Sequence, residues 1–260
     1  MNPVSVNILG CCMSRDVFNI DSPVEYVIKA FVQRQNPFLM FQKPARIVDR
    51  DAFEDYYESM RDRYPECPLT NRMYHRFNRR SMLTLINGSG PSRLLDNKGN
   101  WIVLDTHYVQ SSDMWLLRSD KEDRMFQASY SCYLDTVIDL IPEYADCELE
   151  RVFANANMTL MANRLCRFLD EHWHNHVILI DSRPAEMRDT GDGLVPVHSD
   201  PSFRMASGHM CRLISERIPV HMIELPRNLT SRDGNPVHYT RDMLGWIRQR
   251  VDEIVITDIT

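Results

Sequence analysis

Short apolar runs that end at a turn or acidic residue recur along this chain, and amphipathic patterns separate them. Runs of this kind span residues 4–9, 45–48, 101–104, 177–180 and 220–225. A short apolar run without polar alternation is typical of a strand that is buried on both faces. Strands that alternate with helices form βαβ units, so the sequence predicts a mostly parallel sheet with a flavodoxin-like strand order.

The intervening segments carry helical patterns over residues 15–29, 52–63, 71–86, 133–141, 149–172, 207–216 and 241–254. Two stretches rich in glycine and proline, 87–100 and 190–201, are predicted to be surface loops, which at this length are often lids or binding loops. No internal repeat or break in composition marks a linker. We therefore predict one α/β domain over residues 1–260, a three-layer sandwich with inserted loops.

The charge balance disfavours nucleic acid as a partner. The chain has a formal net charge of -6, whereas binding to the phosphate backbone requires a basic surface. One local exception is the basic cluster Arg72, Arg76, Arg79 and Arg80. It is either a solvated helix face or a contact for an anion.

Neither a membrane span nor a metal or disulfide framework is expected. The amino terminus has no basic segment followed by a long apolar one, and no window approaches the roughly 20 apolar residues that span a bilayer. The seven cysteines are odd in number and scattered, without a CxxC pair. These features predict a cytoplasmic protein with free thiols and no cofactor.

The end of the first apolar run is the strongest candidate for a reactive site. Gly10, Cys11 and Cys12 follow the run, and Ser14 and Asp16 resemble the start of a helix. A strand, a tight turn and a helix place a reactive group at the carboxyl edge of a parallel sheet. Ser14 is expected to cap the helix, and the first helical amides would lower the pKa of the Cys12 thiol from about 8.5. The alternative is that both cysteines only pack under the turn.

A histidine near the carboxyl end is the expected partner of this thiol. His238 lies in a turn after the last predicted strand and before the last helix, at the same sheet edge as Cys12. A thiol and an imidazole form the nucleophile and base of covalent acyl transfer. A third group must orient the imidazole, and both Asn235 and Asp233 are candidates. Each is also a common turn former.

Four other histidines need separate consideration. His172, His174 and His176 lie near a helix end, where interaction with the helix carboxyl terminus explains them better than a metal site. His107 follows a predicted strand beside Asp105 and either lines the cleft or has a structural role.

Several blocks resemble an uncharacterised bacterial SGNH-hydrolase-like family that often occurs beside surface-polysaccharide genes. Residues 10–18 resemble its opening Gly-Ser-Cys-x-Ser-Arg-Asp-x-Phe, and residues 236–239 match its terminal Pro-x-His-Tyr. Residues 31–37, 79–82 and 103–105 resemble intermediate blocks. The resemblance implies a flavodoxin-like, SGNH-like sandwich and an acyl-ester substrate.

The resemblance also implies site residues. Cys12 occupies the position of the SGNH serine nucleophile, two residues after Gly10, and His238 that of the catalytic histidine. Asn235 replaces the acid that usually stands three residues before this histidine, and Cys11 replaces the family serine.

The oxyanion-hole loops of SGNH enzymes correspond to Arg34 or Asn36 and to Asp105 or Thr106. Arg15 and Arg34 are further candidates for binding an anionic group. For Arg15, an ion pair with Asp16 is the alternative.

These features predict an ester hydrolase or acyltransferase that acts on a carbohydrate or glycan precursor through Cys12 and His238. The alternative is an inactive SGNH-like component for binding or assembly in polysaccharide biosynthesis. Nucleotide chemistry ranks last, because neither GxxxxGK[ST] nor GxGxxG is present. The expected partner is a small-molecule or glycan substrate, and the sequence gives no oligomeric state.

Overall fold

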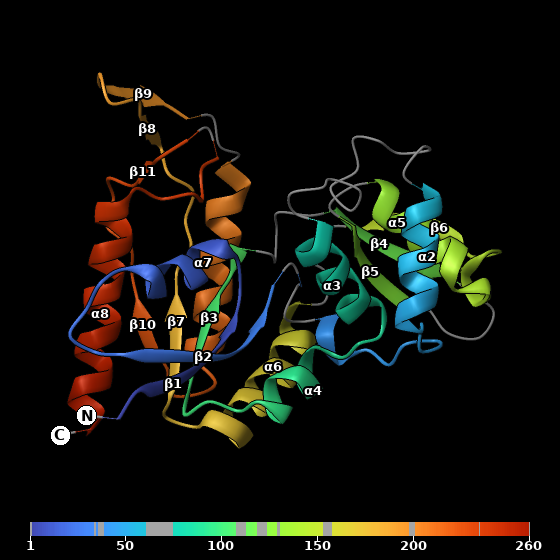
Figure 1. The fold of residues 1–260 in the computed structure, drawn as a ribbon, viewed down its shortest axis with the longest axis horizontal. Helices are drawn as coiled ribbons and strands as arrows, with labels where there is room; N and C mark the ends of the chain where they lie inside the picture. Colours follow the sequence, from blue (N-terminus) through green and yellow to red (C-terminus); the bar gives the residue numbers. More distant parts are fainter. Residues whose placement is uncertain are drawn as a thin grey trace.

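A five-stranded parallel sheet forms the centre of the computed structural model, which describes residues 2–33, 35, 39–60, 75–107, 113–118, 124–128, 131–152, 158–197, 201–233 and 235–259. Its strands are β1 (Val4–Leu9), β2 (Tyr26–Val32), β3 (Trp101–Asp105), β7 (Val177–Ile180) and β10 (His221–Ile223). Their spatial order is β10-β7-β3-β1-β2 (Figure 1). Numbered within this sheet alone, that is the flavodoxin-like order 2-1-3-4-5. The predicted α/β fold with a mostly parallel sheet is confirmed.

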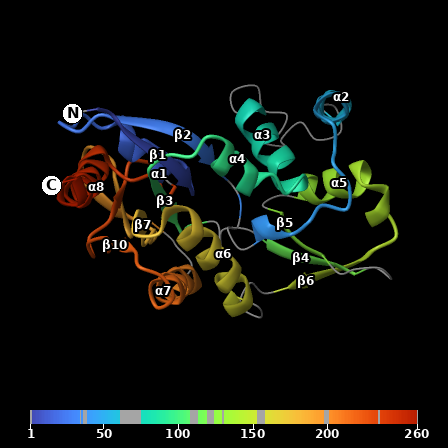
Figure 2. The same ribbon diagram turned by 90° about the horizontal axis from the view of Figure 1, so that it is seen from below.

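Helices cover both faces of this sheet. One face packs against α4 (Gly90–Asp96), α6 (Met158–Trp173) and α7 (Pro201–Ser215), and the other against α1 (Cys12–Asp16), η1 (Val17–Asn19) and α8 (Arg241–Ile259) (Figure 2). Alternate residues of each strand point to opposite faces. Leu104 accordingly belongs to the core with α6, whereas Val103 belongs to the core with α8. The result is a sandwich of three layers.

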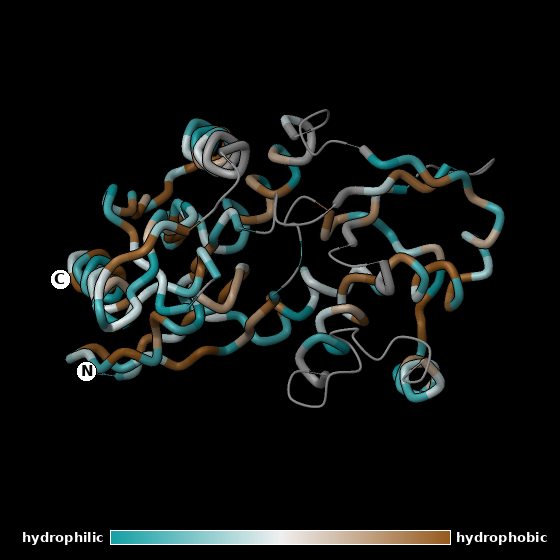
Figure 3. The backbone as a smooth tube through the Cα atoms, turned by 90° about the horizontal axis from the view of Figure 1, so that it is seen from above, coloured by the Kyte–Doolittle hydropathy of each residue, from teal (hydrophilic) through white to brown (hydrophobic). Residues whose placement is uncertain are grey.

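A second unit extends from the central sheet and has a core of its own. It contains the antiparallel strands β4 (Asp113–Arg118), β5 (Arg124–Ala128) and β6 (Glu148–Val152), with β4 in the middle. The helices α2 (Arg50–Met60), α3 (His75–Ile86) and α5 (Ser131–Leu140) and the 3-10 turn η4 (Pro142–Tyr144) contribute to its core, whereas the 3-10 turn η2 (Leu39–Phe41) packs into the core of the central sheet. Hydrophobic segments occur in both parts of the molecule (Figure 3). The single domain over residues 1–260 stays a prediction.

A third, small sheet has the order β11-β8-β9 and projects beyond the carboxyl ends of the central strands (Figure 1). It consists of β8 (Met187–Asp189), β9 (Leu194–Pro196) and β11 (Thr230–Ser231). The residues of β9 are exposed. The predicted loop over residues 190–201 therefore contains an exposed strand.

The prediction of a helix over residues 15–29 is wrong beyond its first turns. Pro23 disfavours a helix there, and residues 26–32 form β2 instead. The first half of β2 alternates between exposed and half-buried side chains, as expected of an edge strand. Valine, isoleucine and phenylalanine, all common in strands, fill this segment.

Three further predictions need correction. Residues 45–48 form no strand, and the Ile47 side chain is 69% exposed. The predicted loop over residues 87–100 contains α4, because Pro91 is suited to the first turn of a helix. The predicted helix over residues 149–172 is replaced at its start by β6, whose pairing with β4 is a long-range contact that local patterns do not encode.

No helix in the described ranges is both long and apolar enough to cross a membrane.

Candidate active site

Cys12 lies at the carboxyl edge of the central sheet, where β1 passes into α1. β1 ends at Leu9, and the Gly10 amide donates to the carbonyl of Val32, the last residue of the neighbouring strand β2 (3.0 Å). Cys11 is the residue before the helix, in an extended conformation, and α1 begins at Cys12 itself. The expected strand, turn and helix are therefore present. The Cys12 side chain is half-buried at the first position of the helix.

A buried carboxylate fixes the turn that carries Cys12. Asp105, at the end of β3, is 1% exposed. One of its oxygens accepts from the Cys11 amide (2.7 Å) and the Ser14 hydroxyl (2.5 Å), and the other accepts from the His107 amide (3.0 Å). Ser14 is thus tied to Asp105, and its predicted role as the cap of α1 is wrong. These contacts give Asp105 a positioning role in place of the substrate contact expected from the sequence.

Gly10 is required by the close approach of Asp105. A Cβ added at Gly10 would lie 2.0 Å from Asp105 Oδ2, far inside van der Waals contact. We expect Gly10→Ala to lower the free energy of unfolding by about 1–3 kcal/mol, the usual cost of overpacking. Urea denaturation measures the effect. Gly208→Ala is the matched control, since a Cβ there meets nothing within 4 Å. Equal stability of wild type and Gly10→Ala would contradict this account.

His238 is held by a tight turn between β11 and α8. Its carbonyl accepts from the Arg232 amide (2.8 Å), and its own amide donates to the Asn235 carbonyl (3.1 Å). The next residue, Tyr239, is 1% exposed, and its hydroxyl donates to the Arg183 carbonyl. The backbone of His238 is therefore anchored on both sides, which limits the positions that the imidazole can reach.

Asp233 and Asn235 contact different nitrogens of the His238 ring. Asp233 Oδ2 lies 2.9 Å from Nδ1, and Asn235 Nδ2 lies 3.3 Å from Nε2. The Cys12 thiol lies beside the same imidazole, close enough for each group to shift the pKa of the other. Because Nδ1 faces the carboxylate, Nε2 is the nitrogen that can exchange a proton with the thiol. Cys12, His238 and Asp233 thus form a continuous chain of contacts.

The surroundings shift the pKa values of both partners toward an ion pair. The pKa of the Cys12 thiol is lowered to about 4. Hydrogen bonding with Cys11 and with His238 lowers it, as do the positive charges of His238 and His107. Burial acts in the opposite direction and raises it. The pKa of His238 is raised to about 9, first by its hydrogen bond with Cys12 and then by Asp233. A thiolate and an imidazolium therefore coexist between about pH 4 and pH 9.

Cys11 contributes to this site in a way that sequence reasoning missed. Its side chain is fully buried, and burial raises its thiol pKa well above the ordinary value. Cys11 thus stays protonated, and its thiol lowers the pKa of the neighbouring Cys12. The signal in the sequence for this role is the pair of adjacent cysteines, separated from the end of the first strand only by Gly10.

Arg15 and Thr106, two further residues considered from the sequence, lie apart from this chain of contacts. Arg34 and Asn36 fall outside the described residues. Arg15 forms an ion pair with Asp16 (2.6 Å), the alternative weighed from the sequence. Thr106 is buried, with its hydroxyl 3.4 Å from that of Ser182.

Two of the histidines near the end of α6 pair with acids. His174 pairs with Asp170 (2.7 Å) and His176 with Asp258 (3.1 Å). Within the described part of the chain, no three His, Cys, Asp or Glu side chains converge as metal ligands would.

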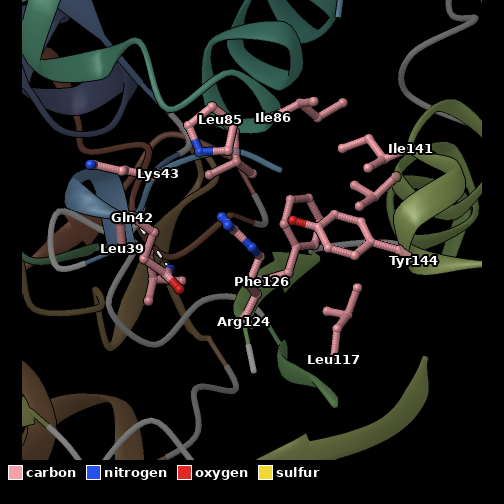
Figure 4. Close-up of a pocket in the computed structure, with 12 residues that line it drawn as sticks. Leu39, Gln42, Lys43, Leu85, Ile86, Leu117, Arg124, Phe126, Ile141 and Tyr144 are labelled. Atoms are coloured by element: carbon pink, nitrogen blue, oxygen red, sulfur yellow. Dashed lines mark hydrogen bonds between the residues drawn. The ribbon is translucent and has the colours of Figure 1, made fainter. Parts of the chain in front are cut away.

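A cavity of about 50 Å³ lies where η2 and the segment after it meet the second unit, beside the end of α3, β5 and α5. Its lining is mainly apolar, as Leu85, Phe126 and Ile141 illustrate, and the Arg124 side chain points into it (Figure 4). None of its lining residues belongs to the Cys12 cluster.

Comparisons with protein-family models, with curated proteins and with solved structures give no match to this chain. Function therefore follows from the chemistry of the Cys12 site, because a flavodoxin-like fold alone supports many activities.

Proposed function

We propose that the protein is an ester hydrolase or acyltransferase in which Cys12 is the nucleophile and His238 the general base and acid. The observation that carries this proposal is the chain of contacts from Cys12 through His238 to Asp233. A nucleophile, a base in contact with it and a group that orients the base are the recurring parts of covalent acyl transfer.

The proposed reaction has two halves. The Cys12 thiolate attacks the carbonyl carbon of an ester, and the tetrahedral intermediate collapses to a thioester as the alcohol leaves with a proton from His238. A water molecule or an acceptor hydroxyl then loses its proton to His238 and attacks the thioester. This step releases the acyl product and restores the thiolate and the imidazolium.

Two groups assist these steps. Asp233 accepts from Nδ1 of His238, which leaves Nε2 for proton transfer. The amide of Cys12 opens α1, and amides at the start of a helix have no acceptor within it. This amide is therefore the donor that we assign to the developing oxyanion.

The assignment to SGNH-like enzymes and to a carbohydrate substrate belongs to the same proposal. It is supported by the strand order of the central sheet, by Cys12 two residues after Gly10, and by the terminal Pro-x-His-Tyr block that carries His238. We also propose a cytoplasmic location. Cys11, Cys12, Cys166 and Cys211 form no disulfide, as expected in a reducing compartment.

Acyl-enzyme formation tests this function. With p-nitrophenyl acetate at pH 7, we expect a burst of one nitrophenolate per protein and one acetyl group on the Cys12 peptide by mass spectrometry. The burst should persist at pH 5.5, because the pKa of Cys12 is lowered to about 4. A thiol that is not acylated at either pH would overturn the proposal and favour the alternative, an SGNH-like binding or assembly component.

A further inference from the structure

A groove runs along the open edge of the central sheet. It is lined by residues 28–31 and Gln33 of β2 and the segment after it, by Arg80 and Ser81 of α3, and by Arg93 and Asn97 at α4. These three elements lie side by side in both ribbon views (Figures 1 and 2). Its volume is about 330 Å³, within the range of small-molecule sites, about 300–1,000 Å³.

All of the charged side chains that line this groove are positive. Lys29, Arg80 and Arg93 line it, and no aspartate or glutamate does. Within the described residues, none of the three forms an ion pair with a carboxylate. Arg79, the neighbour of Arg80, shows the contrast, since it pairs with Glu54 (2.7 Å) and Glu58 (3.0 Å). Arg79 is thus neutralised by two acids, whereas its neighbour Arg80 faces the groove.

Arg93 is held in place. Its guanidinium donates to the Thr84 hydroxyl (2.8 Å) and to the Phe31 carbonyl (3.4 Å). Burial and the charge of Arg80 both lower its pKa, so the two guanidinium groups lie close enough to repel. Two cations brought together without a counterion are unfavourable, and a bound oxyanion would relieve this repulsion.

Lys29 occupies an irregular position in β2. Val6 pairs with Ile28 and Asn7 with Ala30, so Lys29 is an extra residue between two paired ones. A bulge of this kind on an edge strand re-aims a side chain and often lies next to an active site. The exposed ammonium group of Lys29 thereby joins the two arginines along the groove.

One residue of the groove lies close to the helix that begins at Cys12. Phe31 lines the groove, and the Arg15 guanidinium lies 5.8 Å from its ring centroid. Arg15 is part of α1, which begins at Cys12. The polar side chains of Gln33, Ser81 and Asn97 complete the lining with groups that bind hydroxyls.

We propose that Lys29, Arg80 and Arg93 bind the phosphate group of a phosphorylated carbohydrate, which is the substrate or acyl acceptor of the Cys12 site. Arginine matches phosphate oxygens with paired hydrogen bonds, and three cations suit a dianion better than a single carboxylate. The amide and hydroxyl side chains then contact the sugar. The substrate role rests on the proposed function, whereas phosphate binding does not.

Isothermal titration calorimetry with glucose 1-phosphate, inorganic phosphate and glucose tests the proposal. We expect glucose 1-phosphate to bind at least tenfold more tightly than either of the others. Arg80→Gln and Lys29→Gln should each weaken it about tenfold, which equals about 1.4 kcal/mol. Both side chains are exposed, so the fold should be preserved, as circular dichroism can verify. Arg188→Gln, which removes an exposed cation from β8, is the matched control.

Three outcomes would overturn the proposal: no binding of glucose 1-phosphate, equal affinity for inorganic phosphate, or binding that both groove variants leave unchanged. Acetylation of Cys12 by p-nitrophenyl acetate, a neutral ester, does not use the groove. Acetylation without phosphate binding would therefore reject the groove alone, and phosphate binding without acetylation would reject the catalytic role alone.

Discussion

Cys12→Ala is expected to lower the turnover of an acyl ester by about 10⁴-fold or more, because it removes the proposed nucleophile that forms the thioester. The fold should be unaffected, since Cys12 is half-buried at the sheet edge and alanine fits the same helical position. Hydrolysis of p-nitrophenyl acetate under steady-state conditions measures the loss. Cys147→Ala is the matched control, because Cys147 is also half-buried but lies in the second unit.

His238→Ala should have an effect of similar size. The nucleophile and base act as one unit, so the double variant Cys12→Ala/His238→Ala should be little worse than either single one. Wild-type turnover in both single variants would remove the pair from any catalytic role. If their losses multiply in the double variant, the two groups act independently, contrary to the contacts between them.

Much of the central fold follows from local sequence. The strands β1, β3 and β7, buried except for the half-buried Ser5 of β1, appear as apolar runs because both faces of each are covered. β2 lies at the edge of the sheet, where half of its side chains meet solvent, so its composition resembles an amphipathic helix. The second unit depends on antiparallel pairing between β4 and β6, which are far apart in the chain.

The two principal members of the site were predictable, and the third was not. Cys12 follows β1, and the segment that carries His238 leaves the central sheet at the carboxyl end of β10, so both come from the same edge of that sheet. Spacing could not decide between Asn235 and Asp233. In the folded turn, Asn235 Oδ1 accepts from the Val237 amide (3.1 Å), and the Asp233 carboxylate is the group that reaches His238 Nδ1. The groove at Lys29 could not be predicted from the sequence either, because the position of Lys29 depends on the bulge in β2.

Asp233→Asn is expected to lower turnover by about 10²-fold. The carboxylate stabilises the imidazolium and holds Nδ1 as a donor, whereas an amide can do neither as well. Removal of a buried acid that orients a catalytic histidine lowers turnover further, but Asp233 is 49% exposed and partly screened by water. Asn235→Ala is the comparison, with an expected loss of about threefold or less, because Asn235 touches Nε2 without carrying charge.

The pH profile of Cys12 alkylation tests whether Asp233 orients the His238 ring and raises its pKa or only supports the turn. Asp233 helps to raise the pKa of His238 to about 9, so its removal should lower that value. In wild type, the rate of Cys12 alkylation by iodoacetamide should be level from about pH 5 to pH 8 and change only as His238 loses its proton. In Asp233→Asn this change should begin at lower pH. An unshifted profile, or a greater loss of turnover in Asn235→Ala than in Asp233→Asn, would make Asn235 the orienting residue.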